Sequence, residues 1–224
     1  VGTSIMQAKD IALFITQLRG LSETPSHKEV KVKICGIRNL SDAQGAIAAG
    51  ADFLGFNFVQ SSKRYIDPVI AKDIIAAINS DIKIVGVFQN VDVEIVNLIA
   101  DLLQLDYVQL HGEEDEEYMN QVTTKIIKKF HSETVSDNIS YVILDRVTQG
   151  AGEMVDVEKA QRVARHIPTF FAGGLTPENV GAIVEKVRPY AVDVAGGIET
   201  NGMIDTEKVK QFVHNVKHAR KEQK

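Results

Sequence analysis

Four side chains that can take up or release protons stand at the ends of short apolar runs in this sequence. They are Cys35, the only cysteine of the chain, and His111, Asp145 and Asp193. Taken singly, each has an ordinary structural explanation, such as a small buried thiol or an aspartate that forms a turn. Their matching positions after four separate runs favour a common site, and groups of this kind supply general acid and base catalysis.

The elements that would position these residues alternate along the chain. Eight short runs rich in Val, Ile and Phe are predicted strands, at 30–35, 52–58, 83–88, 106–110, 126–130, 140–145, 168–172 and 191–195. A segment with helical spacing follows each one, at 41–49, 67–79, 91–104, 114–122, weakly at 132–138, then 155–165, 176–187 and 205–221. Strict alternation indicates a parallel sheet, and eight units favour a closed (β/α)8 TIM barrel over an open doubly wound sheet. We therefore expect an α/β protein with one catalytic barrel domain at 30–224.

Residues 1–29 lie outside this alternation. Apolar residues recur there at helical spacing from Ile5 to Leu18, which predicts an extra N-terminal helix followed by the linker SETPSHKE. We expect this extension to cover the bottom or flank of the barrel.

Cap chemistry marks several helix starts of the barrel. Asp67-Pro68 and Thr176-Pro177 each combine a side-chain acceptor with proline at the first helical position. Ser41 and Gln44 have the spacing of a capping box.

Side-chain parity provides a test of the common site. Strand side chains alternate between the barrel interior and the surrounding helices, and reacting groups project from the C-terminal strand ends. If Val32 and Ile34 face the helices, Lys33 and Cys35 face inward. The same parity turns four further side chains into the mouth of the barrel, those of Gln109, His111, Asp145 and Asp193.

Two glycine pairs follow the seventh and eighth strands. They are Gly173-Gly174 and Gly196-Gly197. Loops at these positions hold a phosphate in many such barrels, because glycine lets backbone N–H groups approach the ligand closely. The sequence therefore predicts a phosphorylated small-molecule substrate.

Composition limits the possible partners and compartments. A net charge of −5 and a pI near 5.7 argue against a nucleic-acid partner. One cysteine leaves no intramolecular disulfide and suits a reducing compartment. No apolar run approaches the roughly 20 residues that cross a bilayer. We expect a cytoplasmic protein without a membrane partner, either a monomer or a homodimer.

From about residue 30 to residue 200 the sequence resembles one family, phosphoribosylanthranilate isomerase of tryptophan biosynthesis. The similar stretches follow the family's order: VKICGIRNLSDA, GADFLGFNFVQSSKRYIDP, VGVF, VQLHGEE, ILD, AGGLTPENV and RPYAVDVAGGIE. The resemblance implies an intramolecular oxidoreductase of the aldose–ketose isomerase type. Its reaction would be the Amadori rearrangement of N-(5-phosphoribosyl)anthranilate, the third step of tryptophan synthesis from chorismate, with no metal or other cofactor.

The resemblance also implies roles for particular residues. Cys35 matches the family's general base, Asp145 its general acid, and Arg64 in SKRYI the arginine that binds the anthranilate carboxylate. A free thiol has a pKa of about 8.5, and Lys33 on the same inward face could favour the thiolate. Asp145 would have to be protonated, which burial or the negative charges of the substrate would favour. The phosphate would bind at Gly173, Gly174, Gly196 and Gly197, with the site otherwise lined by Lys33, Gln109, His111 and Asp193.

One loop departs from the family pattern. After the sixth strand the family has a GG-[ST]-GK-x-FDW run, whereas this chain has TQGAGEMVDVE, with Glu153 in place of the lysine. Asn57 also stands where an apolar residue is common. The loop change bears on closure of the site and hence on turnover rate, while Asp145 is retained.

Three other functions remain open at this point. The related isomerase of histidine synthesis uses an aspartate where this chain has Cys35, and it has two similar halves that are not seen here. An indole-glycerol-phosphate synthase or an aldolase could use Lys33, but would leave Cys35 unexplained. A barrel that only binds metabolites would not need both Cys35 and Asp145.

Overall fold

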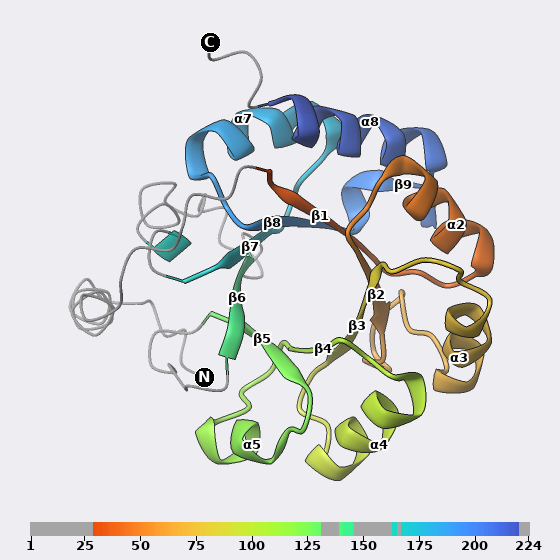
Figure 1. The fold of residues 1–224 in the computed structure, drawn as a ribbon, viewed down its shortest axis with the longest axis vertical. Helices are drawn as coiled ribbons and strands as arrows, with labels where there is room; N and C mark the ends of the chain where they lie inside the picture. Colours follow the sequence, from red (N-terminus) through yellow and green to blue (C-terminus); the bar gives the residue numbers. More distant parts are fainter. Residues whose placement is uncertain (1–28, 131–138, 146–162, 165–166, 220–224) are drawn as a thin grey trace.

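Eight parallel strands close into a barrel in chain order, with helices on the outside (Figure 1). This computed structural model describes residues 29–130, 139–145, 163–164 and 167–219. The strands are β1 (Lys31–Cys35), β2 (Phe53–Asn57), β3 (Lys83–Phe88), β4 (Tyr107–Leu110), β5 (Lys125–Lys129), β6 (Ile139–Asp145), β7 (Thr169–Ala172) and β8 (Ala191–Val194). The predicted (β/α)8 barrel is therefore confirmed, with each of the eight strands close to its expected position.

Helices follow the strands as the alternation predicts. They are α2 (Leu40–Ala49), α3 (Pro68–Ala76), α4 (Val93–Leu103), α5 (Glu116–Gln121), α7 (Pro177–Val187) and α8 (Thr206–His218). A 3-10 helix, η1 (Gly196–Ile198), and a small antiparallel hairpin of β9 (Glu199–Thr200) and β10 (Met203–Ile204) separate β8 from α8. The predicted helix from Ile5 to Leu18, the one at 132–138 and most of the one at 155–165 lie outside the described residues.

Barrel closure places β1 between β2 and β8. In the register of these three strands, Lys33 is opposite Phe53 of β2 and Asp193 of β8. Cys35 is opposite Gly55. The pairing of β1 with β8 thereby brings Lys33 and Asp193, which are far apart in the sequence, next to each other.

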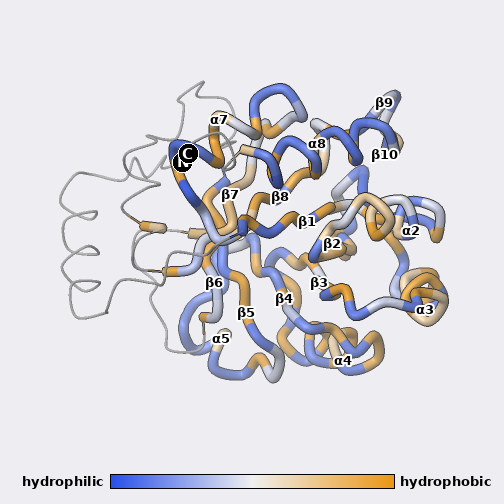
Figure 2. Tube along the Cα trace, turned by 45° about the horizontal axis from the view of Figure 1, so that its top comes forward, coloured by the Kyte–Doolittle hydropathy of each residue, from blue (hydrophilic) through white to orange (hydrophobic). Residues whose placement is uncertain are grey.

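The strand parity predicted from the sequence produces two separate cores. Side chains such as Val32, Val142 and Val192 pack against the helices, whereas Ile143 and Ala191 pack inside the barrel. Figure 2 shows hydrophobic and hydrophilic residues mixed along the helices that surround the strands, for example along α4. Among the described residues, no helix combines the length and the apolar character needed to cross a membrane.

Aromatic side chains fill the interior at the N-terminal ends of the strands. Tyr141 and Tyr190 stack with ring centroids 4.7 Å apart, and Phe53, Tyr107 and Phe170 pack around them mainly edge to face. Burial raises the pKa of Tyr107 to about 12. This apolar layer fills the barrel interior at the N-terminal ends of the strands, which leaves the C-terminal ends for a polar site.

Two of the three predicted helix starts are confirmed, and one is wrong. Asp67 accepts from the N–H of Val69, and Thr176 is the N-cap of α7. The first residue of α2 is Leu40, and its N-cap is Asn39, whose side chain accepts from the N–H of Asp42 at 2.8 Å. Asn39 has extended backbone angles and already satisfies a free N–H, so a cap at Ser41 is not needed.

Candidate active site

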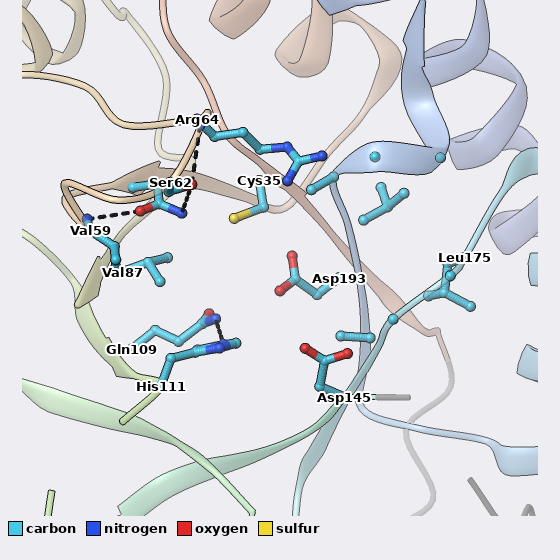
Figure 3. A pocket seen from close by; sticks show the side chains of 18 of the residues that line it. Cys35, Val59, Ser62, Arg64, Val87, Gln109, His111, Asp145, Leu175 and Asp193 are labelled. Carbon is cyan, nitrogen blue, oxygen red and sulfur yellow. Dashed lines mark hydrogen bonds between the residues drawn. The ribbon is translucent and has the colours of Figure 1, made fainter. Parts of the chain in front are cut away.

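A cavity of about 720 Å³ opens at the C-terminal ends of the strands (Figure 3). Nearly every residue expected at the site lines it, namely Cys35, Arg64, Gln109, His111, Asp145, Asp193 and the four glycines at 173, 174, 196 and 197. Lys33 is not among the described lining residues, because its side chain is fully buried behind the wall. These lining residues come from β1, β4, β6 and β8 and from the loops after β2, β4, β7 and β8.

Cys35 and Asp145 end β1 and β6 on different sides of this cavity, and Asp193 lies between them in the view of Figure 3. Asp193 interacts electrostatically with both. Its charge adds to burial in raising the pKa of Cys35, and the charge of Asp145 adds to burial in raising the pKa of Asp193. A molecule in the cavity can therefore touch a thiol on one side and a carboxyl group on the other.

Lys33 and Asp193 form a buried ion pair next to Cys35. The distance from Lys33 Nζ to Asp193 Oδ2 is 3.0 Å, and the two side chains are 0% and 8% exposed. Burial alone would lower the pKa of Lys33, but Asp193 and Cys35 outweigh it and the pKa is raised. Burial raises the pKa of Asp193 in spite of Lys33. The raised pKa of Lys33 favours its ammonium form, whereas the raised pKa of Asp193 favours its neutral acid. The 3.0 Å contact between them is that of an ammonium paired with a carboxylate.

The thiol of Cys35 has a raised pKa. Burial is the main cause; Lys33 opposes it, and the charge of Asp193 adds to it. Lys33 therefore favours the thiolate as expected from the sequence, but its ammonium group is also paired with Asp193. At neutral pH the resting side chain is a thiol.

Gln109 connects His111 with Asp193. Its Nε2 lies 2.6 Å from His111 Nε2, and its amide interacts with the Asp193 carboxyl group. Gln109 Oε1 and Asp193 Oδ1 are buried without a hydrogen-bond partner among the described residues. These buried acceptor atoms at the wall favour a ligand that carries O–H or N–H donors.

Arg64 lies on a loop that Asn57 organises. The Asn57 side chain accepts from the N–H of Val59 at 2.9 Å and donates to Ser62 Oγ at 3.2 Å. Ser62 Oγ in turn accepts from the N–H of Arg64 at 3.1 Å. The unusual Asn57 thus has a structural purpose, because it folds the loop that carries the arginine.

Glycine is required at these positions of the site for different structural reasons. Gly173 and Gly174 have φ of 84° and 64°, a conformation that other residues adopt at a cost. An added Cβ at Gly197 would overlap the backbone oxygen of Leu175, so the loops after β7 and β8 approach closely there. An added Cβ at Gly196 would lie 3.1 Å from Arg64 Nη2.

Sequence reasoning missed a buried ion pair behind His111. Lys128 Nζ lies 2.6 Å from Glu114 Oε2 and donates to the carbonyl oxygen of Gly112 at 2.7 Å. Glu114 Oε1 accepts from the N–H groups of Gly112 and Asn90. Together these bonds hold the turn that follows His111. The sequence signal was the pair of lysines in the predicted strand IIKKF, of which Lys128 is only 2% exposed.

Comparison with known proteins gives a consistent result. A family model described as N-(5′-phosphoribosyl)anthranilate isomerase matches residues 32–215. Proteins of that name from Geobacter sp. and Geotalea daltonii are 42% and 37% identical, each over 199 residues. These alignments cover 84% of this chain in both cases, and 98% and 96% of the two relatives.

Solved structures agree with these sequence matches. A phosphoribosyl anthranilate isomerase from Thermotoga maritima has a TM-score of 0.75 and 35% identity, covering 84% of this chain and 98% of its own. Another structure of such an isomerase, in complex with reduced 1-(o-carboxyphenylamino)-1-deoxyribulose 5-phosphate, has a TM-score of 0.74, 35% identity and the same coverage.

Proposed function

This chain belongs to the N-(5′-phosphoribosyl)anthranilate isomerase family, and we propose that Cys35 and Asp145 are the general base and general acid of its reaction. The reaction is the Amadori rearrangement of N-(5-phosphoribosyl)anthranilate to 1-(o-carboxyphenylamino)-1-deoxyribulose 5-phosphate, in tryptophan synthesis. One observation carries the assignment of residues: the thiol that ends β1 and the carboxyl group that ends β6 line a single cavity.

The chemistry needs one proton donor and one proton acceptor. Protonation of the furanose ring oxygen breaks its bond to C1′ and leaves a Schiff base between C1′ and the anthranilate nitrogen. Removal of the C2′ proton then gives an enolamine, which becomes the ketone by tautomerisation. In our proposal Asp145 donates the first proton and Cys35 removes the second, since each stands on its own side of the sugar.

Charged and polar groups of the wall would act on Cys35 and on the substrate. Cys35 must lose its proton, and Lys33 is the cation beside it that stabilises the thiolate. The unpaired Oδ1 of Asp193 and Oε1 of Gln109 would accept from the hydroxyl or amine groups of the substrate.

The two ends of the substrate would bind at opposite parts of the cavity. Arg64 would bind the anthranilate carboxylate, because a planar guanidinium matches a carboxylate in a two-point contact. The phosphate would bind the backbone at Gly173, Gly174, Gly196 and Gly197. We infer that the enzyme works in the cytoplasm, because a reducing compartment keeps a lone catalytic thiol in its reduced form.

A fluorescence assay tests this function directly. The substrate is generated in situ from anthranilate and ribose 5-phosphate, and the decay of the anthranilate-moiety fluorescence is followed after the protein is added. Wild-type protein should accelerate the decay. A protein that binds the substrate without changing its fluorescence would be a binding barrel, and the proposed roles would be wrong.

A further inference from the structure

We propose that Glu199 is a positioning residue that orients Arg64 and thereby determines how well the enzyme selects a substrate with a carboxylate on its aromatic ring. The inference rests on the proposed role of Arg64. It concerns a residue beyond the set that the sequence pointed to, on the short hairpin after β8.

Glu199 holds one edge of the Arg64 guanidinium by two parallel hydrogen bonds. Arg64 Nε donates to Glu199 Oε1 at 2.6 Å, and Arg64 Nη2 donates to Oε2 at 3.0 Å. This pair uses two of the five N–H donors of the side chain and leaves three, two on Nη1 and one on Nη2. Two of the remaining donors are parallel at the end of the guanidinium, where a second carboxylate can bind in the same two-point manner.

The free end of Arg64 belongs to the cavity, whereas Glu199 does not. Arg64 is among the residues that line the cavity, and Glu199 is not among the described lining residues. Glu199 is 13% exposed at its side chain and binds the Nε–Nη2 edge of the guanidinium. The glutamate is therefore placed to aim the arginine without competing for the end that a substrate would reach.

The side chain of Arg64 passes close to the backbone of two glycines. An added Cβ at Gly36 would lie 2.7 Å from Arg64 Cδ, and one at Gly196 would lie 3.1 Å from Nη2. The side chain thus runs through a slot that admits no larger neighbours. With Glu199 bound to one edge, the guanidinium is fixed in both direction and rotation.

Glu199 itself stands on a well-anchored segment. Its backbone oxygen accepts from Lys208 Nζ at 2.9 Å, which ties the segment to α8. Arg38 joins the segment to the loop of Arg64, donating to the carbonyl oxygens of Lys63 and Gly202. The hydrogen bonds from Arg64 lower the pKa of Glu199, so the glutamate stays ionised at neutral pH.

The test compares two substrates that differ only in the carboxylate. N-(5-phosphoribosyl)anthranilate and N-(5-phosphoribosyl)aniline are each made in situ from ribose 5-phosphate and the free amine. The quantity measured is the ratio of kcat/KM for the first substrate to that for the second. In Glu199→Gln this ratio should fall roughly 10- to 100-fold, the usual effect of loosening a binding group by about an ångström. The ratio should fall because KM for the anthranilate substrate rises, with kcat/KM for the aniline substrate unchanged.

Three further variants make the result decisive. Glu199→Asp keeps the charge but shortens the side chain, and it should recover part of the ratio. Glu207→Gln removes an exposed glutamate of α8 that pairs with Lys210, and it should leave the ratio at the wild-type value. Arg64→Lys keeps a cation but loses the planar fork, and it should lower the ratio at least as much as Glu199→Gln.

The outcomes separate this inference from the proposed function. Equal losses for both substrates in Glu199→Gln would show a purely structural role and overturn the inference. A lowered ratio in Arg64→Lys with an unchanged ratio in Glu199→Gln would also overturn it, while leaving Arg64 as the carboxylate-binding residue. An unchanged ratio in Arg64→Lys would overturn the role of Arg64 itself.

Discussion

Lys33 Nζ lies 3.0 Å from Asp193 Oδ2, in a pair that is buried beside the thiol of Cys35. The two residues are 160 positions apart in the sequence and meet because β8 pairs with β1. The lysine is the cation that stabilises a thiolate, and the aspartate is the anion that opposes it. Burial of the thiol, with the charge of Asp193, outweighs the lysine and leaves Cys35 protonated at rest.

The first prediction concerns pH. The thiolate is the active form of a general base, and the pKa of Cys35 is raised above that of a free thiol, about 8.5. Activity of the free enzyme, measured as kcat/KM, should therefore still be rising with pH above neutrality. Because Cys35 is the only cysteine, the difference in ultraviolet absorbance between the wild type and Cys35→Ser reports the titration of its thiolate. A titration complete below neutral pH would contradict the raised pKa.

Neutralising Asp193 should move this titration to lower pH. Asp193→Asn removes the negative charge and releases Lys33 to interact with Cys35, and both changes favour the thiolate. The rising part of the pH profile should shift in the acid direction together with the thiolate absorbance. Asp106→Asn, which breaks an exposed pair with Lys83, serves as the control and should leave Cys35 unchanged. A shift in the alkaline direction would refute the charge balance inferred for this pair.

Removal of either proton-transfer group should lower kcat with little effect on KM. Cys35→Ser and Asp145→Asn keep the size of the side chain and change its acidity. Each should reduce kcat by about 10²- to 10⁴-fold, the usual contribution of general acid–base catalysis. The fluorescence assay under saturating substrate measures this loss. A variant that retained near wild-type kcat would exclude that residue from proton transfer.

A methyl group at Gly55 should disturb Cys35. An added Cβ would lie 2.8 Å from Cys35 Sγ and 3.1 Å from Lys33 Cε. Gly55→Ala should lower kcat by about tenfold or more through displacement of the thiol, and destabilise the fold by about 1–3 kcal/mol through overpacking. Gly181→Ala in α7 is the matched control, since nothing lies within 4 Å of its added Cβ. It should leave kcat unchanged and raise stability by roughly 0.5–1 kcal/mol.

The buried pair behind His111 should matter for stability more than an exposed pair does. Lys128→Met leaves Glu114 buried without its cation, which should cost about 3–5 kcal/mol. Lys210→Met breaks an exposed pair with Glu207 and should change stability by less than about 1 kcal/mol. Urea unfolding followed by circular dichroism measures both. Equal small effects would show that the Lys128 pair is not needed to hold the turn.

Local patterns in the sequence were enough to predict the barrel and the inward side of each strand. Alternating polarity separates residues that face the helices from residues that face the interior, and this depends only on the two-residue period of a strand. The positions of Cys35 and Asp145 at the cavity follow from that period and from the rule that sites lie at C-terminal strand ends. The predicted N-cap of α2, Ser41, was wrong because Asn39 and Ser41 are both good caps, and only backbone geometry distinguishes them.

The long-range pairs were decided by the closed barrel. Glu199 meets Arg64 across 135 residues, and Asp193 meets Lys33 across 160. No periodicity in the sequence specifies which buried lysine pairs with which acid, because that depends on the register between strands and on how closely neighbouring loops approach. The sequence by itself determined the fold and the chemical groups at its mouth. Tertiary structure alone decided the charge state of Cys35 and the orientation of Arg64, since both depend on partners that only barrel closure brings into contact.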